Sequence, residues 1–231
     1  MLSPITLEEK LDFIQDRIYK AATSAGRNPN NITLIAVTKT LSINIWEKAL
    51  EINLTTIGES NIQETIEKSE NFTKRKKIKL HLIGHLQSNK VKKAINLFDV
   101  IQTVDSIKLA ERINRLCINK QQQIYIQINT AKDPKKHGLF PEKAEKVAEK
   151  ISTMDNLILR GIMTISPKGI NKSDLSKVYN NTRKIRDNIY SRINDCCQYI
   201  SMGMSNDYET AIAEGATHIR IGTGLFGERK I

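Results

Sequence analysis

The alternation of two hydrophobic patterns along the chain constrains its fold more than any other feature of the sequence. Short apolar runs rich in β-branched residues are separated by segments in which apolar residues recur with the period of an amphipathic helix. Runs that are apolar throughout are typical of parallel strands buried on both faces. The predicted strands cover residues 32–38, 54–58, 79–84, 99–104, 123–129, 158–165, 199–203 and 217–221.

Eight strands that alternate with helices predict an α/β fold in which a parallel sheet closes into a (β/α)8 barrel of the TIM type. An extra helix over about residues 6–25 precedes the first strand, and Gly26 and Pro29 mark its end. An open, doubly wound parallel sheet is the alternative that the same alternation allows. No linker, low-complexity tract or internal repeat divides the sequence, so residues 1–231 are predicted to form a single domain.

Composition and the first residues of the chain exclude several classes of protein. No apolar run approaches the length of about 18 residues that marks a transmembrane helix. The opening segment MLSPITLEEK becomes acidic and amphipathic too early for a secretory signal. Three cysteines among 231 residues are typical of reduced thiols in the cytoplasm. We therefore expect a cytoplasmic protein that does not associate with membranes.

The net charge of +11 is the one compositional feature that favours a nucleic-acid partner. Proteins that bind nucleic acid cluster their basic residues on one face and place aromatic side chains among them. Here aromatic residues make up only 5% of the chain, and the lysines are interspersed with glutamates. We interpret the basic run KRKKIK, residues 74–79, as a solvated connection. An RNA-associated basic protein stays an alternative, which salt-dependent binding would reveal.

A lysine at the end of the first predicted strand is the clearest candidate for chemistry. The segment ITLIAVTKT, residues 32–40, is apolar at its centre and reaches Lys39 where the strand ends. In (β/α)8 barrels the chemistry lies at the carboxyl ends of the strands. A desolvated lysine loses its proton more readily than one in water, and the free amine can attack a carbonyl group. The alternative is a structural lysine held in a salt bridge.

Two glycine-rich strand ends predict a phosphate-binding site. In SMGMSND, after the seventh strand, Gly203 allows close approach of the backbone, and Ser205 or Asn206 can cap the next helix. In RIGTG, after the eighth strand, residues 222–224 form a second turn rich in N–H groups. The last two strands are the usual phosphate site of these barrels, and helix N-termini bind anions. The alternative is a pair of tight turns that bind no ligand.

Closure of the barrel would bring the lysine and the phosphate site together, because the eighth strand would then lie beside the first. A phosphorylated aldehyde held at the glycine-rich turns would present its carbonyl group to Lys39. The product of that reaction is a Schiff base, and pyridoxal 5′-phosphate (PLP) is the ligand that satisfies both requirements. The residues therefore predict PLP as the cofactor.

Several long motifs carry a resemblance to a known family. They are LIAVTKT, the GES-IQE pattern, HLIGHLQSNK, GIMTI and SMGMSNDYETAIAEGATHIRIGTGLFGER. Over nearly its whole length the sequence resembles the PLP-binding proteins of the YggS/PROSC type, which are similar to the barrel domain of alanine racemase. The resemblance implies a barrel like the alanine racemase N-terminal domain, with PLP as its cofactor.

The resemblance also implies which residues contact the cofactor. Lys39 would form the Schiff base, and Arg220 would face the pyridine nitrogen. Ser205 with the backbone of Gly203 and Met204, and Gly222 with Thr223, would bind the phosphate. The implied cofactor-binding set, which includes no catalytic residue and no metal ligand, is Lys39, Asn61, Met163, Ser201, Gly203, Met204, Ser205, Arg220, Gly222 and Thr223.

The chain departs from the family pattern in the segment GESNIQE. The family usually has Asn and then Tyr after the glutamate, whereas this sequence has Ser60 and Asn61. The family's asparagine stands at position 60, so Asn61 is expected to make the same polar contact from the next position in the chain.

The resemblance implies a PLP carrier or buffer that serves vitamin B6 and amino-acid homeostasis, rather than an enzyme. Most PLP enzymes place a carboxylate at the pyridine nitrogen, whereas an arginine such as Arg220 disfavours the protonated ring. A weak PLP-dependent amino-acid racemase is the alternative, because alanine racemases use the same arginine. Racemisation also needs a second base, and Tyr208 is poorly placed for that role. Expected partners are PLP, PLP-dependent apoenzymes or other B6 vitamers, and the expected state is a monomer.

The histidines do not predict a metal site. His81 and His85 lie at the two ends of a predicted strand, and a spacing of four residues in a strand gives no shared face for a metal ion. His137 and His218 have no metal-binding partners near them in the sequence.

A basic loop, AKDPKKHG, follows the fifth predicted strand. The barrel rule places Lys132, Lys135 and Lys136 on the same face as Lys39. These lysines would either attract the phosphate of PLP and offer a second amine, or belong to a solvated turn without a function.

Overall fold

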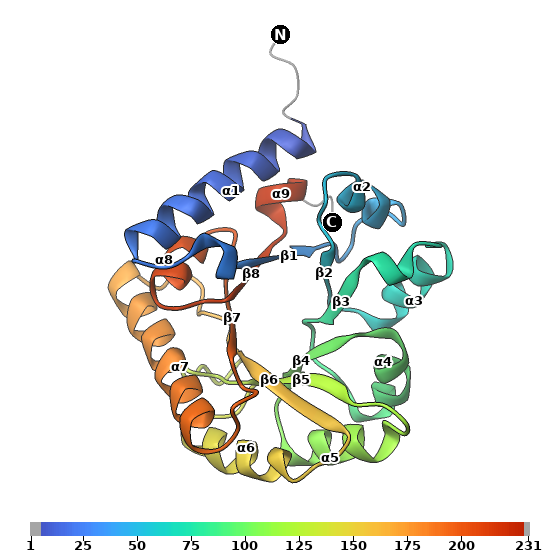
Figure 1. Ribbon diagram of the computed structural model, residues 1–231, viewed down its shortest axis with the longest axis vertical. Helices are drawn as coiled ribbons and strands as arrows, with labels where there is room; N and C mark the ends of the chain where they lie inside the picture. Colours follow the sequence, from blue (N-terminus) through green and yellow to red (C-terminus); the bar gives the residue numbers. More distant parts are fainter. Residues whose placement is uncertain (1–5, 229–231) are drawn as a thin grey trace.

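The computed structural model describes residues 6–228 and shows a closed barrel of eight parallel strands surrounded by helices (Figure 1). Each strand pairs in parallel with the next one, and the last strand pairs with the first. The prediction of a (β/α)8 barrel is therefore confirmed, and the open doubly wound sheet is wrong. The ends of the predicted 1–231 domain, including Arg229 of the GLFGER motif, lie outside the described residues.

The predicted strands differ from the observed ones by no more than two residues at either end. The strands are β1 (Thr33–Val37), β2 (Thr56–Glu59), β3 (Lys79–Leu82), β4 (Val100–Val104), β5 (Gln122–Gln127), β6 (Leu157–Met163), β7 (Tyr199–Met204) and β8 (His218–Ile221). The α-helices are α1 (Leu7–Ser24), α2 (Ile45–Glu51), α3 (Ile62–Glu70), α4 (Val91–Leu97), α5 (Ile107–Leu116), α6 (Ala144–Ser152), α7 (Lys172–Arg192), α8 (Tyr208–Ala213) and α9 (Thr223–Phe226).

The extra N-terminal helix α1 lies beside α8 on the outside of the barrel (Figure 1). Its start is fixed by a capping box, in which Thr6 and Glu9 satisfy each other's backbone N–H groups. Arg17 forms an ion pair of 2.8 Å with Glu209 of α8. Among the described residues, no helix is both long enough and apolar enough to span a membrane.

The outer side of the strands is apolar, and the inside of the barrel holds polar side chains beside a small apolar cluster. Successive side chains of a strand point to opposite faces, so His218 and Arg220 share one face of β8, while Ile219 packs in the main hydrophobic core. Gln102 of β4 contacts Ser201 of β7 at 2.7 Å. Because β4 and β7 are not neighbours in the barrel, this contact crosses its interior.

Candidate functional site

Lys39 lies at the carboxyl end of β1, where the sequence placed it. The strand ends at Val37, Thr38 is completely buried, and Lys39 is half-buried. Thr40 then takes a left-handed backbone conformation, with a φ angle of 60°. Such a conformation is uncommon for a β-branched residue, and it turns the chain sharply directly after Lys39.

A buried charge network fixes the backbone on both sides of Lys39. The ammonium group of Lys68, on α3, donates to the carbonyl oxygen of Thr38 at 2.7 Å. The same ammonium group bonds to Glu59 at 2.8 Å and to Glu64 at 2.6 Å. Glu64 in turn accepts from the backbone N–H of Thr40 at 2.6 Å. Lys39 is thus held between two backbone groups that this network anchors.

The network extends under the strand end through two further side chains. Thr38 donates its hydroxyl to Glu59 at 2.6 Å, and the indole N–H of Trp46 lies 3.1 Å from the Thr38 hydroxyl oxygen. Glu59 is completely buried, and this burial raises the pKa of its carboxyl group against the opposing effect of Lys68. The sequence analysis missed Lys68, although its spacing of four residues from Glu64 on a helix could have suggested an ion pair.

The pairing of β1 with β8 brings Lys39 to the glycine-rich turns. Ile35 lies opposite Arg220, and Ala36 lies opposite Ile221. Parallel strands end at the same edge, so Lys39 and the turn after Ile221 share one mouth of the barrel. The prediction that the first and last strands lie side by side is therefore confirmed.

The two glycine-rich turns meet through Ser205. Its hydroxyl oxygen accepts a hydrogen bond of 3.2 Å from the backbone N–H of Gly224, in the first turn of α9. Gly222 is the N-cap residue of α9, and Thr223 is exposed at its first position. The turns predicted to bind phosphate thus form one surface, which we call the phosphate cradle: Gly203, Ser205 and residues 222–224.

The predicted cap of the next helix is wrong. Helix α8 begins at Tyr208, and its N-cap residue is Asp207, without a hydrogen bond from the side chain to the helix. Ser205 and Asn206 lie too early in the turn to cap it. Asp207 instead accepts from the backbone N–H of Met204 at 2.5 Å. This bond occupies one of the backbone groups that the resemblance assigns to phosphate.

Asp207 is a second residue that the sequence analysis missed. One of its oxygens accepts from the hydroxyl of Ser166 at 2.7 Å and from that of Tyr179 at 2.9 Å. Burial raises the pKa of the Tyr179 hydroxyl, and the nearby carboxylate adds to the effect, so this tyrosine is a neutral donor. These bonds tie the loop after β6, helix α7 and the cradle together.

Arg220 is buried in the barrel interior and makes two hydrogen bonds there. Its guanidinium group donates to the hydroxyl of Ser201 at 2.9 Å and to the carbonyl oxygen of Thr164 at 2.8 Å. Burial lowers the pKa of Arg220, yet an arginine keeps its charge in proteins. The chain of bonds continues from Ser201 to Gln102, and from Gln102 to His81 at 2.7 Å.

The two remaining residues of the predicted set have clear positions in the structure. Met163 is the last residue of β6, and it packs inside the barrel with Val100 and Tyr125. Asn61 is the N-cap of α3, where its side-chain oxygen accepts from the N–H of Gln63 at 2.9 Å. Met163 and Asn61 lie at the same end of the barrel as Lys39, and their contact with a cofactor stays a prediction.

The lysines of the basic loop are largely engaged by the protein. Lys132 pairs with Glu142, and Lys136 donates to the carbonyl oxygen of Ser166. Burial also lowers the pKa of Lys136. Lys135 is exposed. The loop follows β5 and so lies at the carboxyl ends of the strands, the same face as Lys39, as the sequence predicted.

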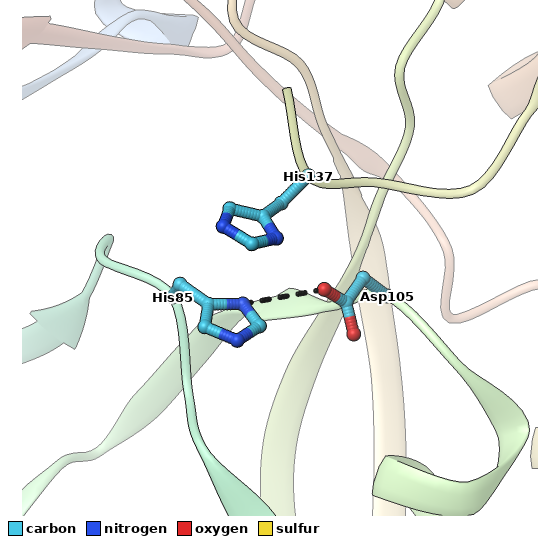
Figure 2. A group of neighbouring side chains, drawn as sticks. All are labelled: His85, Asp105 and His137. Carbon is cyan, nitrogen blue, oxygen red and sulfur yellow. Dashed lines mark ion pairs between the residues drawn. The ribbon is translucent and has the colours of Figure 1, made fainter. Parts of the chain in front are cut away.

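His137 has no metal-binding partners near it in the sequence, but the fold brings two other candidate ligands close to it. The ligand atoms of His85, Asp105 and His137 all lie within 4.8 Å of one another (Figure 2). The sequence analysis missed this cluster because its members come from three loops. His81 points elsewhere, into the barrel interior, where it contacts Gln102, whereas His85 contacts Asp105.

Comparisons with known proteins agree with the sequence motifs. The family described as "Alanine racemase, N-terminal domain" matches residues 10–230. A protein of Aquifex aeolicus named "Pyridoxal phosphate homeostasis protein" is 35% identical over 224 residues, which cover 96% of this chain and 98% of the relative.

Two solved structures have the same fold over nearly the whole chain. A protein of unknown function from Bifidobacterium adolescentis has a TM-score of 0.90 and 35% sequence identity, with 95% of this chain and 94% of that chain covered. PipY of Synechococcus elongatus, solved with PLP bound, has a TM-score of 0.80 and 32% identity, with coverage of 93% and 100%.

Proposed function

The chain belongs to the family of the alanine racemase N-terminal domain, and from this premise we propose that it binds PLP and buffers it for vitamin B6 and amino-acid homeostasis. One observation carries the proposal. The pairing of β1 with β8 brings Lys39 and the phosphate cradle to the same mouth of the barrel. The PLP-bound structure of PipY and the names of the relatives support the same ligand.

The chemistry of the residues fits PLP. When bound, PLP supplies an aldehyde that an amine can attack and a phosphate that needs several donors. Lys39 provides the amine, and the hydroxyl of Ser205 and the first turn of α9 provide donors for a dianion. The guanidinium of Arg220, held by Ser201 and Thr164, provides a positive group at the strand end.

The charge that the site would present to the pyridine nitrogen bears on turnover. The resemblance assigns the buried Arg220 to that nitrogen, where its positive charge would disfavour protonation of the ring. Asp207, the carboxylate close to the cradle, is engaged by Ser166, Tyr179 and the backbone of Met204. These features weaken carbanion chemistry and support a carrier, whereas the arginine itself is shared with alanine racemases.

The wider setting of the protein belongs to the same proposal. All three cysteines are free, which supports a reducing compartment such as the cytoplasm. PLP-dependent apoenzymes are the partners that a PLP carrier requires, and a monomer is the state that we propose. Residues 1–231 would act as one unit, since Lys39 comes from the early part of the chain and the phosphate cradle from its late part.

The test is a Lys39→Ala variant mixed with PLP and treated with borohydride, which makes a lysine–PLP link permanent. Peptide mass spectrometry should find the added mass on Lys39 in the wild-type protein and no stoichiometric adduct in the variant. Lys135→Ala, which removes an exposed lysine at the same end of the barrel, is the matched control and should keep the adduct.

Two results would contradict the proposal. One is an undiminished adduct on a different lysine in the Lys39→Ala protein. The other is sustained interconversion of alanine enantiomers by wild-type protein purified from a strain that lacks alanine racemase, because that would favour the enzyme alternative.

A further inference from the structure

We propose that His85, Asp105 and His137 bind a divalent transition-metal ion of the zinc type, at a site separate from Lys39 and the phosphate cradle. The three residues follow β3, β4 and β5, whereas Lys39 and the cradle follow β1, β7 and β8. Both groups lie at the carboxyl ends of the strands, on opposite sides of the barrel mouth (Figure 1).

The proximity of the ligand atoms carries the proposal: Nδ1 of His85 and Oδ2 of Asp105 are 3.3 Å apart, and the ligand atoms of all three residues lie within 4.8 Å of one another (Figure 2). The rings of His85 and His137 are stacked with centroids 3.9 Å apart and planes 12° apart, so one exposed ring must turn about its side-chain bonds before both nitrogens can point at one ion. Zinc bonds of about 2.0–2.2 Å in a tetrahedral arrangement place neighbouring ligand atoms about 3.3 Å apart. The distance between Nδ1 of His85 and Oδ2 of Asp105 already has this value.

An ordinary ion pair explains only part of this arrangement. Asp105 contacts His85, but that contact does not require a second imidazole within 4.8 Å. A metal ion would accept all three ligands at once.

The protein holds the backbone of both histidines in place without any ion. The Thr103 hydroxyl donates to the carbonyl oxygen of Gly84, next to His85, at 2.8 Å. The side chain of Gln127 donates to the carbonyl oxygen of His137 at 3.0 Å. Because these bonds already fix the backbone, less conformational entropy is lost when a ligand orders the two histidines.

The ligand types select the class of ion. Two imidazole nitrogens and one carboxylate suit zinc and its neighbours in the first transition row, whereas Mg²⁺ and Ca²⁺ prefer oxygen ligands. Three protein ligands also leave coordination positions open. His85 and His137 are exposed, so water can reach those positions.

The test is a calorimetric titration of the full-length, tag-free protein with zinc chloride, and a parallel titration with magnesium chloride. We expect one zinc ion per chain and no magnesium binding. His85→Gln, Asp105→Asn and His137→Gln should each weaken zinc binding by about a hundredfold or more, since loss of groups that merely support a metal ligand already costs about 10- to 100-fold.

The matched control variants change residues at the opposite end of the barrel, in the loop before β7. Asp195→Asn removes an exposed carboxylate. Cys196→Ser removes the most accessible of the three thiols, since cysteine is a common zinc ligand and could bind the ion instead. Both variants should bind zinc as the wild type does. Co²⁺, which takes the same ligands, should give visible absorption bands in the wild type that are absent in His137→Gln.

Three results would overturn the proposal. They are no zinc binding by the wild type, unchanged affinity when all three ligands are replaced, and loss of binding in Cys196→Ser. Thermal unfolding of each variant in a chelator separates loss of a ligand from loss of the fold.

Discussion

Asp207 shows how one carboxylate determines which donors the phosphate cradle can offer. It engages the N–H of Met204 on one oxygen, and the hydroxyls of Ser166 and Tyr179 on the other. In the first turn of α9, the N–H groups of Gly224 and Leu225 already donate to Ser205 and Gly222, so a dianion at the cradle must rely chiefly on the Ser205 hydroxyl. Ser205 accepts from Gly224, and this leaves its own hydroxyl hydrogen available to donate.

Ser205→Ala should therefore weaken PLP binding selectively. A charge-assisted hydrogen bond contributes about 1.5–3 kcal/mol, so the affinity for PLP should fall about tenfold or more. Pyridoxal lacks the phosphate, so its affinity should change little. Equilibrium binding of both ligands, followed by absorbance, checks the expectation.

Asn206→Ala is the matched control for Ser205→Ala. Asn206 is the next residue and is exposed, so its replacement should leave both affinities unchanged. Equal losses of PLP and pyridoxal affinity in Ser205→Ala would show that this hydroxyl does not serve the phosphate.

At the scale of residues, the sequence predicted the positions that depend on strand ends. Lys39 and Ser205 follow from the rule that the carboxyl ends of parallel strands form the active face. The contacts of Lys68 with Thr38 and Glu59 and the cluster around Asp105 could not be predicted in this way. They join residues of different elements, and no local pattern encodes such contacts.

At the scale of elements, the packing of α8 against β7 depends on Gly203. Its φ angle is 88°, in the left-handed region. An added Cβ would lie 2.5 Å from Cβ of Ala211 and 2.9 Å from Cα of Tyr208. The turn that carries the cradle therefore has no room for a side chain.

Gly203→Ala should lower the free energy of unfolding by about 2–5 kcal/mol, from the left-handed backbone and from overpacking together. Gly169→Ala is the matched control, because its φ angle is 72° and nothing lies within 4 Å of the added Cβ. That variant should lose only the backbone contribution of about 1–2 kcal/mol. Urea unfolding of both proteins measures the difference, and equal losses would show that the contact with α8 is unimportant.

The order and type of the elements were predictable because the outer strand faces and the inner helix faces form one continuous apolar core. The polar interior of the barrel was not predictable. An apolar run such as β1 suggests burial on both faces, whereas β8 alternates His218, Ile219 and Arg220. Only closure of the barrel shows that the polar positions of several strands meet inside it.

At the scale of the whole molecule, the polar interior makes stability depend on pH. Burial, with smaller contributions from Lys79 and Arg220, lowers the pKa of His218 to about 3. Burial also lowers the pKa of His81 well below its ordinary value, and His218 and Lys79 add to that effect. The uncharged rings of Tyr125 and Tyr199 face His218 as well.

The unfolded chain therefore binds more protons than the folded protein as the pH falls below about 6.5. The free energy of unfolding should be constant above that pH and fall between about pH 6.5 and pH 3. His218 should contribute a loss of about 1.3 kcal/mol between pH 7 and pH 5.5, and His81 should add a loss in the same direction. Urea unfolding at these two pH values gives the loss directly.

His218→Gln keeps a polar side chain but removes one of the two titrating groups, so about half of the pH dependence should disappear. An unchanged pH dependence in this variant would mean that other groups cause the loss of stability.

The closure of the barrel between β1 and β8 also has a consequence for synthesis of the protein. Lys39 emerges from the ribosome well before Ser205 and the first turn of α9. Because more than 150 residues separate these groups, a nascent chain that stops short of α9 has the amine without the cradle. Ligand binding would thus stabilise only molecules in which the segment from β1 to α9 has been made and folded.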